Sequence, residues 1–356
     1  MKIYIDINHP AHIHYFKNFI KIMESKGHHF VVSNRDDKMI NYLLDYYKIA
    51  HYTRNKRRNN KSIWNVILNL LLIAKFCFVK SMAHKPDIYI AIASFPLALV
   101  AFVRRKPCVN LDDTEHTKMN HLLYPLFSSA IITPFYFEKH LGRKQIRFQA
   151  YFEQFYLHSK YYKQDVISTL KAEDKYVLIR YIAYDAIHDR RTQAVSKKTK
   201  KEIVVELSKK FKVLISEESE FIDDFYKPYL IKIPPEKIHD AIANAIFFIS
   251  EGATMAAEAG ILGTSYVYIN PLYAGNVNCQ IKNYSQIACQ TSEKNKIMDI
   301  VRNIIDKKLL TDKLSVRNEI ENDTINPTDF LVWFVENYPK SKKIVKEDSN
   351  YQYNFK

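Results

Sequence analysis

The turn from Ser250 to Thr254 carries the clearest chemical signal in the sequence. It follows a short apolar run and opens a segment rich in small residues, which predicts a strand, a tight turn and then a helix. The first N–H groups of a helix have no partner within it, and with the helix dipole they favour phosphate groups. We therefore predict a diphosphate site formed by Ser250, Gly252, Ala253 and Thr254; an ordinary strand–helix turn is the alternative.

Glu258 lies one helical turn beyond Thr254 and faces the same side of the predicted helix. Its carboxylate is positioned to accept hydrogen bonds from the hydroxyl groups of a ribose. The neighbouring small residues should let this helix lie close to the sheet: Ala256, Ala257, Ala259 and Gly260.

Three histidines, His9, His12 and His14, follow the first apolar run of the chain. Open parallel sheets bind ligands at the carboxyl ends of their strands, so one of these side chains could act as a general base or bind phosphate. A zinc site is the alternative, but it requires a further ligand that the linear sequence does not identify.

Four ionisable side chains follow the apolar run 107–111: Asp112, Asp113, Glu115 and His116. Such a group at the end of a buried strand can supply a positioned acid or base. The alternative is the acidic start of a helix, where Asp and Thr cap the chain and carboxylates favour the dipole.

A further polar cluster follows the apolar run 175–181, and Arg180 is its cation. A guanidinium group can bind a phosphate through two parallel hydrogen bonds, so Arg180 could hold a phosphate group of a ligand. A solvated loop is the alternative. The cluster comprises Arg180, Tyr181, Tyr184, Asp185, His188 and Asp189, of which Arg180, Asp185 and His188 are the predicted ligand contacts.

Short apolar runs alternate with segments of helical spacing in the first half of the chain, which predicts a parallel sheet covered on both faces. The predicted strands are 2–7, 28–33, one around Ile49, 87–92, 107–111 and 130–133. The predicted helices are 12–25, 37–46, 63–82 and 95–103.

A second series begins after the aromatic and polar stretch 149–174, with strands predicted at 175–181, 212–216, 231–233, 245–250 and 265–269. The fold class is therefore α/β, with two doubly wound parallel-sheet domains in tandem. A chain of 356 residues, 47% of them hydrophobic, suffices for two cores. We place an N-terminal domain at 1–165, a C-terminal domain at 166–338 and a polar tail at 339–356.

The net charge of +15 comes from lysines spread along the whole chain. A basic surface favours anionic partners such as nucleotide phosphates, phospholipid headgroups or acidic glycans, and we expect no nucleic-acid partner. The cysteines lack zinc spacing, and the first apolar run is too short and polar for a signal peptide, so we expect a cytoplasmic protein. The cysteines are Cys77, Cys108, Cys279 and Cys289.

The segment 63–79 is a long apolar run that follows the basic stretch 54–61. Asn65, Asn69 and Lys75 interrupt it, whereas a bilayer span requires about twenty apolar residues. We predict a helix packed on the sheet. A peripheral membrane contact through the basic stretch is the alternative.

Four segments in order resemble the motif series of an uncharacterised prokaryotic family, domain of unknown function family 354. The resemblance extends from Met1 to about Pro271. That family is grouped with the GT-B superfamily, alongside the glycosyltransferase that makes lipid II and UDP-N-acetylglucosamine 2-epimerase. The segments are DINHPAHIHYFKN, LDDTEHTKMN, RYIAYDAIHD and IPPEKIHDAIANAIFFISEGATMAAEAGILGT.

The resemblance implies GT-B architecture: two Rossmann-like domains facing an inter-domain cleft, with a nucleotide-sugar held mainly by the C-terminal one and no required metal. Gly252, Thr254 and Glu258 match residues that contact diphosphate and ribose in the relatives. His12 best fits the position of a histidine in the first loop of the lipid II enzyme. The segment 112–116 stands where the epimerase has a catalytic acidic and histidine stretch.

These observations predict a metal-independent glycosyltransferase that moves a sugar from a nucleoside diphosphate to a glycan or lipid-linked acceptor during surface polysaccharide or glycolipid synthesis. No cofactor is expected, since the nucleotide-sugar is a substrate and no D-x-D triplet is present. His12, Asp113 or Glu115 would accept the acceptor's proton. The alternatives are an epimerase or hydrolase that uses Asp113, Glu115 and His116, and a non-catalytic subunit of a glycan assembly at the inner face of the membrane.

Overall fold

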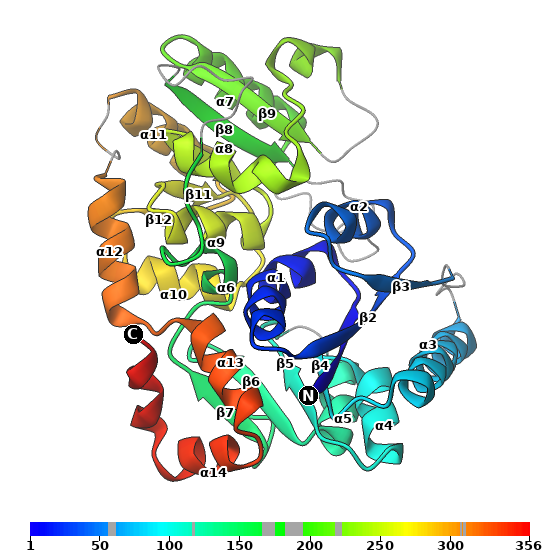
Figure 1. Cartoon of the computed structure of the whole chain (residues 1–356). Helices are drawn as coiled ribbons and strands as arrows, with labels where there is room; N and C mark the ends of the chain where they lie inside the picture. The colour runs from blue at the N-terminus through cyan, green and yellow to red at the C-terminus, as the bar shows by residue number, and fades with distance from the viewer. Residues whose placement is uncertain are drawn as a thin grey trace. The chain divides into compact units, whose positions relative to one another are not determined.

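The chain divides into two compact α/β units, each built on a parallel sheet (Figure 1). The computed structural model describes residues 1–55, 62–115, 118–165, 175–181, 195–217, 223–306, 308 and 311–356. Unit 1 comprises Met1–Tyr156 and Thr324–Lys356, and unit 2 comprises Leu157–Asp323. The prediction of two doubly wound parallel-sheet units is confirmed.

The sheet of unit 1 has seven strands in the order β3-β2-β1-β4-β5-β6-β7, and all of its pairings are parallel. The strand order reverses between β1 and β4, the place where open α/β sheets bind ligands. Its strands are β1 (Lys2–Ile7), β2 (His29–Arg35), β3 (His51–Arg54), β4 (Ile88–Ile92), β5 (Cys108–Leu111), β6 (Ala130–Pro134) and β7 (Gln145–Phe148).

Two helix layers cover this sheet. Since crossovers between parallel strands are right-handed, the reversal at β1 and β4 puts the first two helices on one face and the next three on the other. The first layer holds α1 (Pro10–Ser25) and α2 (Lys38–Tyr46). The second layer holds α3 (Ile63–His84), α4 (Phe95–Val103) and α5 (Lys118–Phe127).

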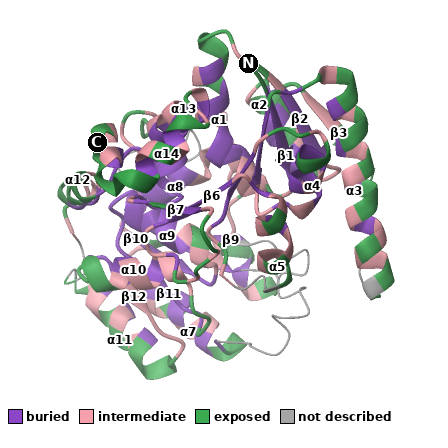
Figure 2. Cartoon of the chain, turned by 90° about the horizontal axis from the view of Figure 1, so that it is seen from below, coloured by how far each residue is buried: buried purple, intermediate pink, exposed green. Residues whose placement is uncertain are grey.

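Buried apolar strands form the centre of unit 1, drawn in purple in Figure 2. Ile3, Tyr4 and Ile5 of β1 are fully buried, as expected for a central strand with helices on both faces. The sequence pattern predicts α4 with the observed bounds, but it does not reveal α5 or β7.

The last segment of the chain belongs to unit 1, which differs from the predicted domain at 166–338 and polar tail at 339–356. The apolar side of α13 (Pro327–Glu336) packs beside α1, and Glu336 pairs with Lys26 at 2.7 Å. Beyond it, α14 (Lys340–Glu347) and the 3-10 helix η4 (Ser349–Phe355) fold back, and Trp333 stacks on Tyr351. Aromatic burial therefore holds this segment on the first sheet.

The first boundary also lies earlier than predicted, after Tyr156 instead of residue 165. The aromatic stretch before it, which includes the short helix α6 (Gln154–Leu157), is part of the core of unit 1. Phe152 and Tyr156 pack against Tyr15 of α1 with ring centroids 5.1 and 5.7 Å apart. A stretch without strand or helix periodicity is thus a packed element and not a linker.

The sheet of unit 2 has five parallel strands in the order β12-β11-β10-β8-β9. They are β8 (Tyr176–Tyr181), β9 (Lys212–Glu217), β10 (Phe247–Ser250), β11 (Tyr266–Tyr268) and β12 (Ala288–Gln290). The helices are α7 (Lys197–Ser208), η2 (Asp224–Tyr229), η3 (Pro235–Lys237), α8 (Ile238–Asn244), α9 (Ala253–Ile261), α10 (Gly275–Asn283), α11 (Lys294–Ile305) and α12 (Lys313–Asp323).

The strand predicted at 231–233 is wrong. Only an isolated bridge joins Leu230 to Ile215 of β9, and the chain then enters η3 through Pro234 and Pro235. Proline has no N–H to donate to a strand ladder, so the pairing ends there.

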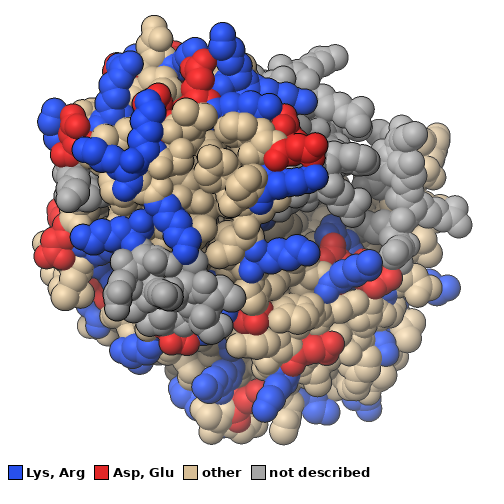
Figure 3. All heavy atoms as spheres, turned by 90° about the horizontal axis from the view of Figure 1, so that it is seen from above, with Lys and Arg blue, Asp and Glu red and all other residues tan. Residues whose placement is uncertain are grey.

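The basic excess of the chain is spread over its surface. Lys and Arg number 53 against 38 Asp and Glu. On the face drawn in Figure 3, the blue basic side chains are scattered, with red acidic side chains among them. Net charge alone therefore does not locate a binding surface on this face.

Gly263 follows the C-terminal end of α9 and lies in the left-handed backbone region, with a φ of 74°; the predicted diphosphate turn is at the other end of the helix. A Cβ atom at this position would lie 2.2 Å from the carbonyl oxygen of Lys313. Gly142 has a similar φ of 83°, but a Cβ atom there would meet nothing within 4 Å. A comparison of alanine substitutions at the two glycines therefore separates the cost of backbone strain from the cost of steric overlap.

We expect Gly263→Ala to lower the free energy of unfolding by about 2–4 kcal/mol, and Gly142→Ala by about 1–2 kcal/mol, because only the first adds overlap to the strain. Urea unfolding of each variant beside the wild type measures both losses. Equal losses in the free energy of unfolding would show that a Cβ atom at position 263 does not overlap the backbone of Lys313.

Candidate functional site

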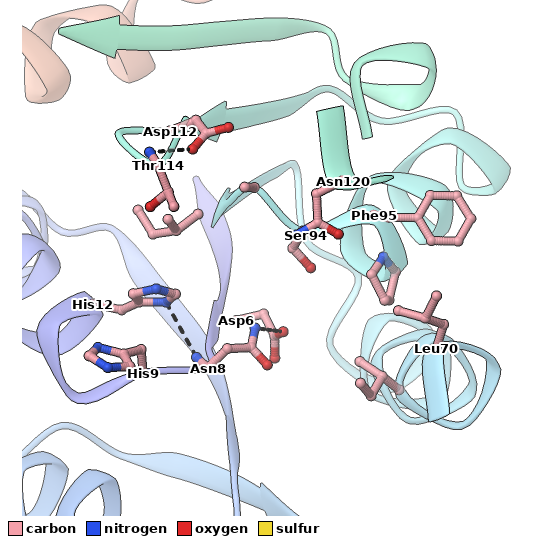
Figure 4. A pocket seen from close by; sticks show the side chains of 14 residues that line it. Asp6, Asn8, His9, His12, Leu70, Ser94, Phe95, Asp112, Thr114 and Asn120 are labelled. Atoms are coloured by element: carbon pink, nitrogen blue, oxygen red, sulfur yellow. Dashed lines mark hydrogen bonds between the residues drawn. The ribbon is translucent and has the colours of Figure 1, made fainter. Parts of the chain in front are cut away.

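A pocket of about 280 Å³ lies in unit 1, where the strand order reverses (Figure 4). Its walls come from the carboxyl ends of β1, β4 and β5 and from the adjoining parts of α3, α4 and α5. His9 and His12 line it, as predicted for the loop after β1, whereas His14 is buried in the core between Tyr47 and Tyr156.

Two helices begin at this pocket. His9 caps α1 by accepting the N–H of Ala11 at 3.2 Å, and Ser94 caps α4 by accepting the N–H of Leu97 at 3.4 Å. Both capping residues line the pocket. The positive ends of two helix dipoles therefore favour an anionic group there.

His12 is held in one tautomer. Its Nδ1 accepts the backbone N–H of Asn8 at 3.3 Å, so the proton of the neutral ring lies on Nε2. Burial, followed by the charges of His9 and Arg35, lowers the pKa of His12 to about 3. Near neutral pH this side chain is thus a hydrogen-bond donor to the pocket, which is not the state that a general base requires.

Asp6 lines the pocket, but its carboxylate is bound by other side chains of the protein. It is fully buried and accepts hydrogen bonds from Ser33 Oγ at 2.6 Å and Asn8 Nδ2 at 2.8 Å, and it forms an ion pair with Arg54. Arg54 also donates to Asn8 Oδ1. The membrane contact considered for the basic stretch 54–61 is therefore wrong for Arg54, which is buried and paired with Asp6. Residues 56–61 lie outside the described residues.

Asp112 has a similar anchoring role in the loop after β5. It is fully buried and accepts hydrogen bonds from the N–H of Thr114 at 3.0 Å and from the hydroxyl of Tyr124 at 2.6 Å. His121 Nε2 also lies 3.0 Å from its carboxylate. With its acceptor sites engaged, this carboxylate fixes the loop and positions its neighbour, Asp113.

The carboxyl group of Asp113 has a raised pKa. Burial and the charge of Asp112 raise the pKa of Asp113 to about 6, although hydrogen bonds from Thr114 Oγ1 at 3.0 Å and Tyr15 OH at 3.3 Å oppose the rise. Its neighbours Asp112 and Thr114 line the pocket, and the ring of Tyr15 stacks on His12. A carboxyl group with this pKa can exchange protons near pH 7.

The other predicted catalytic residues are placed differently. Glu115 Oε1 accepts the backbone N–H of Glu138 at 2.7 Å, so it ties its loop to the chain after β6. His116 lies outside the described residues. Catalytic roles for Glu115 and His116 remain predictions.

In unit 2, the candidate residues lie at the carboxyl edge of the sheet. Arg180 of β8 pairs in register with Ser216 of β9 on one side and Ser250 of β10 on the other. Arg180 Nη1 donates to Ser216 Oγ at 2.6 Å, which holds the guanidinium group at this edge. Asp185 and His188 lie outside the described residues.

The predicted diphosphate turn leads directly into α9. Ser250 Oγ accepts the N–H of Gly252 at 3.0 Å and donates to its carbonyl at 2.8 Å, which closes the turn. Gly252 is the N-cap residue and supplies no side-chain acceptor, and Thr254 in the first turn is exposed. This helix start therefore has the open N-terminal geometry that binds phosphate.

A buried ion pair that the sequence pattern does not indicate supports this turn. Glu251 is 1% exposed and its Oε1 lies 2.6 Å from Lys200 Nζ of α7. Asn270 Nδ2 donates to the carbonyl of Glu251 at 3.1 Å, which links the turn to the loop after β11. These contacts fix the backbone before the helix, so its N–H groups are preorganised.

Glu258 points away from solvent, whereas the prediction that it binds the hydroxyl groups of a ribose requires an accessible carboxylate. It is 5% exposed, and its Oε1 lies 3.3 Å from Nε2 of His239 on α8. Gly260 is close to Gln280 of α10, where an added Cβ atom would lie 2.0 Å from Oε1. The small residues of α9 thus allow close helix packing, and a ribose contact of Glu258 remains a prediction.

The described residues contain no group of three or more His, Cys, Asp or Glu side chains that could hold a metal ion. At the edge of unit 2, Arg180 and the start of α9 supply a cation and free N–H groups, which suits an anionic ligand.

Comparison with solved structures identifies the architecture. UDP-GlcNAc 2-epimerase from Neisseria meningitidis, solved with UDP-GlcNAc, has a TM-score of 0.66 at 12% identity, over 94% of this chain and 99% of that one. MnaA of S. aureus, solved with UDP, has a TM-score of 0.67 at 12% identity, over 96% and 97%. MurG from Acinetobacter baumannii has a TM-score of 0.59 at 12% identity, over 94% and 99%. The fold is therefore that of GT-B glycosyltransferases and epimerases.

Sequence comparison gives the family. An uncharacterized protein of Methanocaldococcus jannaschii is 24% identical over 357 residues, which cover 96% of this chain and 99% of the relative. The family model described as "Protein of unknown function (DUF354)" matches residues 1–340. The predicted resemblance is confirmed, and the chain belongs to the DUF354 family.

Proposed function

We propose that the protein is a metal-independent glycosyltransferase that moves a sugar from a nucleoside diphosphate to an acceptor hydroxyl in surface polysaccharide or glycolipid synthesis. The observation that carries this proposal is the open N-terminus of α9, held beside Arg180 at the carboxyl edge of unit 2. Proteins of the same fold have been solved with UDP and UDP-GlcNAc, which makes a nucleoside diphosphate the first ligand to test.

The donor half of the reaction requires stabilisation of a leaving diphosphate. The first N–H groups of α9, including that of Thr254, would hold its oxygens, and Arg180 would add a positive charge. Preorganised donors of this kind stabilise developing negative charge without reorganisation during the reaction. No metal ion takes part in this step as proposed.

The acceptor half requires removal of a hydroxyl proton. Asp113 is the proposed base, because Asp6 and Asp112 are fully engaged with protein donors and Glu115 is tied to Glu138. Neutral His12 would donate from Nε2 to the acceptor or the donor sugar, in place of the base role considered for it from the sequence.

The raised pKa of Asp113 also supports a second candidate, a sugar-nucleotide epimerase or hydrolase. A carboxyl group that can both give and take a proton near pH 7 suits an epimerisation, which needs no acceptor. The protein would act in the cytoplasm in either case.

A single incubation separates the proposed transferase from a 2-epimerase. With UDP-GlcNAc alone in D₂O, a 2-epimerase must break the C2–H bond, so deuterium would enter at C2 of the sugar. The proposed transferase would leave C2 unlabelled and release UDP only slowly, with water as a poor acceptor. NMR of the recovered nucleotide measures both, and labelling at C2 would replace the transferase proposal with the epimerase.

The donor site predicts a specific role for Arg180. We expect Arg180→Ala to raise the Kd for UDP by about 10–100-fold, because it removes a charged hydrogen-bond donor to the diphosphate. Isothermal titration calorimetry measures the constants. Arg302→Ala is the matched control, since Arg302 lies on the exposed surface of the same unit and pairs with Asp299 at 2.8 Å.

Two results would contradict this assignment. The first is failure of the wild type to bind any nucleoside diphosphate, which would favour a non-catalytic subunit. Alternatively, Arg180→Ala and Arg302→Ala could weaken UDP binding equally, which would remove the diphosphate from the edge of β8.

The proposed base predicts the pH dependence of turnover. Only deprotonated Asp113 accepts a proton, so the rate of UDP release from UDP-GlcNAc should rise with pH and level off above about 6. His12 adds no step in this range, because its pKa is about 3. Asp113→Asn should lower the plateau by about 10²–10⁴-fold and abolish the step.

Stability provides an independent check on Asp113. A folded-state pKa above the ordinary value of 3.8 means that the native protein holds the proton more tightly than the unfolded chain, so wild-type stability should fall as pH rises from about 4 to 6. Asp113→Asn should lack that loss. A rate step without a matching stability change would assign the titration to another group.

A further inference from the structure

The helix α3 exposes apolar side chains along most of its length, and green and pink segments dominate it in Figure 2. Trp64 is 75% exposed and Leu71 is 56% exposed, and Ile67 and Phe78 continue the same side at helical spacing. The stretch Trp64–His84 is long and apolar enough to cross a membrane by length and composition, yet only 22% of its most apolar window is buried. The sheet therefore covers only a narrow side of this helix.

The neighbouring helices extend this apolar surface. The helices α3, α4 and α5 are adjacent in one layer (Figure 1), and each adds exposed apolar side chains. Leu122 of α5 is 72% exposed and Phe102 of α4 is 61% exposed. We call the set the α3–α5 face: Trp64, Ile67, Leu71, Leu72, Phe78, Val79, Met82, Phe102, Val103, Met119, Leu122 and Leu126. Exposed apolar side chains gathered on neighbouring helices are typical of an interaction site.

Basic side chains outnumber acidic ones on and beside the α3–α5 face. The sequences of the three helices contain no Asp or Glu. Basic side chains lie on and beside them. The acidic residues between residues 62 and 127 are Asp87, which lies 3.8 Å from Lys106, and the group Asp112, Asp113 and Glu115 in the loop before α5. The basic residues are Lys75, Lys80, Lys85, Arg104, Arg105 and Lys106. An apolar face with a cationic border is complementary to an anionic lipid surface.

The connectivity of α3 excludes a membrane span. It joins β3 to β4, and both strands belong to the same sheet. Ile73, Cys77 and Ser81 are buried on its inner side, and Ser81 Oγ hydrogen-bonds the hydroxyl of Tyr89 in β4. A helix that is anchored to a sheet along its length can lie in the interface, but it cannot cross the bilayer.

We propose that the α3–α5 face docks unit 1 on the surface of an anionic lipid bilayer, with the exposed side chains of α3 and α5 inserted at the boundary between headgroups and acyl chains. The protein binds as a peripheral membrane protein. The contact is made by an apolar face and its basic border, and this surface differs from the basic stretch 54–61 considered from the sequence.

This docking would also position the pocket of unit 1. Leu70 and Ile73 of α3, Phe95 of α4 and Asn120 of α5 line the pocket, while other side chains of the same helices form the α3–α5 face. The pocket would therefore lie next to the lipid surface. This step rests on the proposed function: the acceptor hydroxyl would belong to a molecule anchored in the bilayer.

Vesicle flotation tests the docking surface with the full-length protein and no nucleotide. The probes are vesicles of phosphatidylcholine alone and vesicles of phosphatidylcholine mixed with phosphatidylglycerol. We expect binding to the mixed vesicles, weaker binding to the neutral ones, and at least about a tenfold lower bound fraction for Leu71→Glu combined with Phe78→Glu, because two side chains would lose their insertion.

Leu314→Glu is the matched control, because Leu314 is a 66% exposed leucine on α12 of unit 2. It should bind vesicles like the wild type, and the melting temperatures of all variants should agree within a few degrees, since the substituted side chains are exposed. Circular dichroism checks that the doubly substituted protein is folded.

Three outcomes would overturn the proposal. The first is that the wild type does not float with either vesicle, and the second is that the doubly substituted protein floats as well as the wild type. The third is that the wild type binds no vesicle and forms a dimer in solution, which the double substitution converts to a monomer. The last result would assign the α3–α5 face to a second copy of the chain. None of these outcomes depends on UDP binding, so they leave the proposed donor site to its own test.

Discussion

Parallel pairing of strands is the constraint on which both candidate sites depend. In each unit all strand pairings are parallel, so the carboxyl ends of neighbouring strands meet at one edge. In unit 1 this edge gathers loops that are more than a hundred residues apart in the sequence, at His9 and Asp112. In unit 2 it aligns Arg180 with Ser250 in register. The chemistry of both edges follows from the helix starts and polar side chains found there.

The acidic residues of unit 1 show how burial divides structural from reactive groups. Asp6 and Asp112 are fully buried, and each has at least three protein partners that satisfy its charge. A buried carboxylate whose acceptor sites are filled by protein donors has a structural role. Asp113 has weaker partners and a charged neighbour, so its proton affinity rises toward neutral pH. The buried charge of Asp112 thus contributes to the raised pKa of Asp113, the residue proposed as the base.

The sequence predicts the elements that have strong periodicity and misses those that depend on distant packing. Helix α4 has the predicted bounds, and the strand–turn–helix unit around Ser250 and Gly252 has the predicted form. The fold of the last segment on α1 could not be predicted, because the ion pair between Lys26 and Glu336 joins residues 310 positions apart. The strand predicted at 231–233 failed because flanking prolines outweighed its apolar character.

The candidate sites show the same division. The residue types at the strand ends were sufficient to predict His12, Asp113 and the turn before α9 as candidates. Their protonation states and partners were not accessible, because these depend on Asn8, Tyr15 and burial in three dimensions. Two further contacts likewise join different elements, and no local spacing in the sequence indicates them. They are the ion pair between Glu251 and Lys200 and the approach of Glu258 to His239.

Helix α3 shows why composition alone could not assign its environment. An amphipathic helix has one apolar side for the sheet, but α3 is apolar on nearly all sides, which is typical of a helix buried in protein or in lipid. Protein covers only the side that contains Ile73 and Cys77. Trp64, Leu71 and Phe78 are 75%, 56% and 37% exposed on the other side. A surface that covered them would stabilise the protein in proportion to the apolar area that it buries, and the basic residues at the border favour an anionic surface.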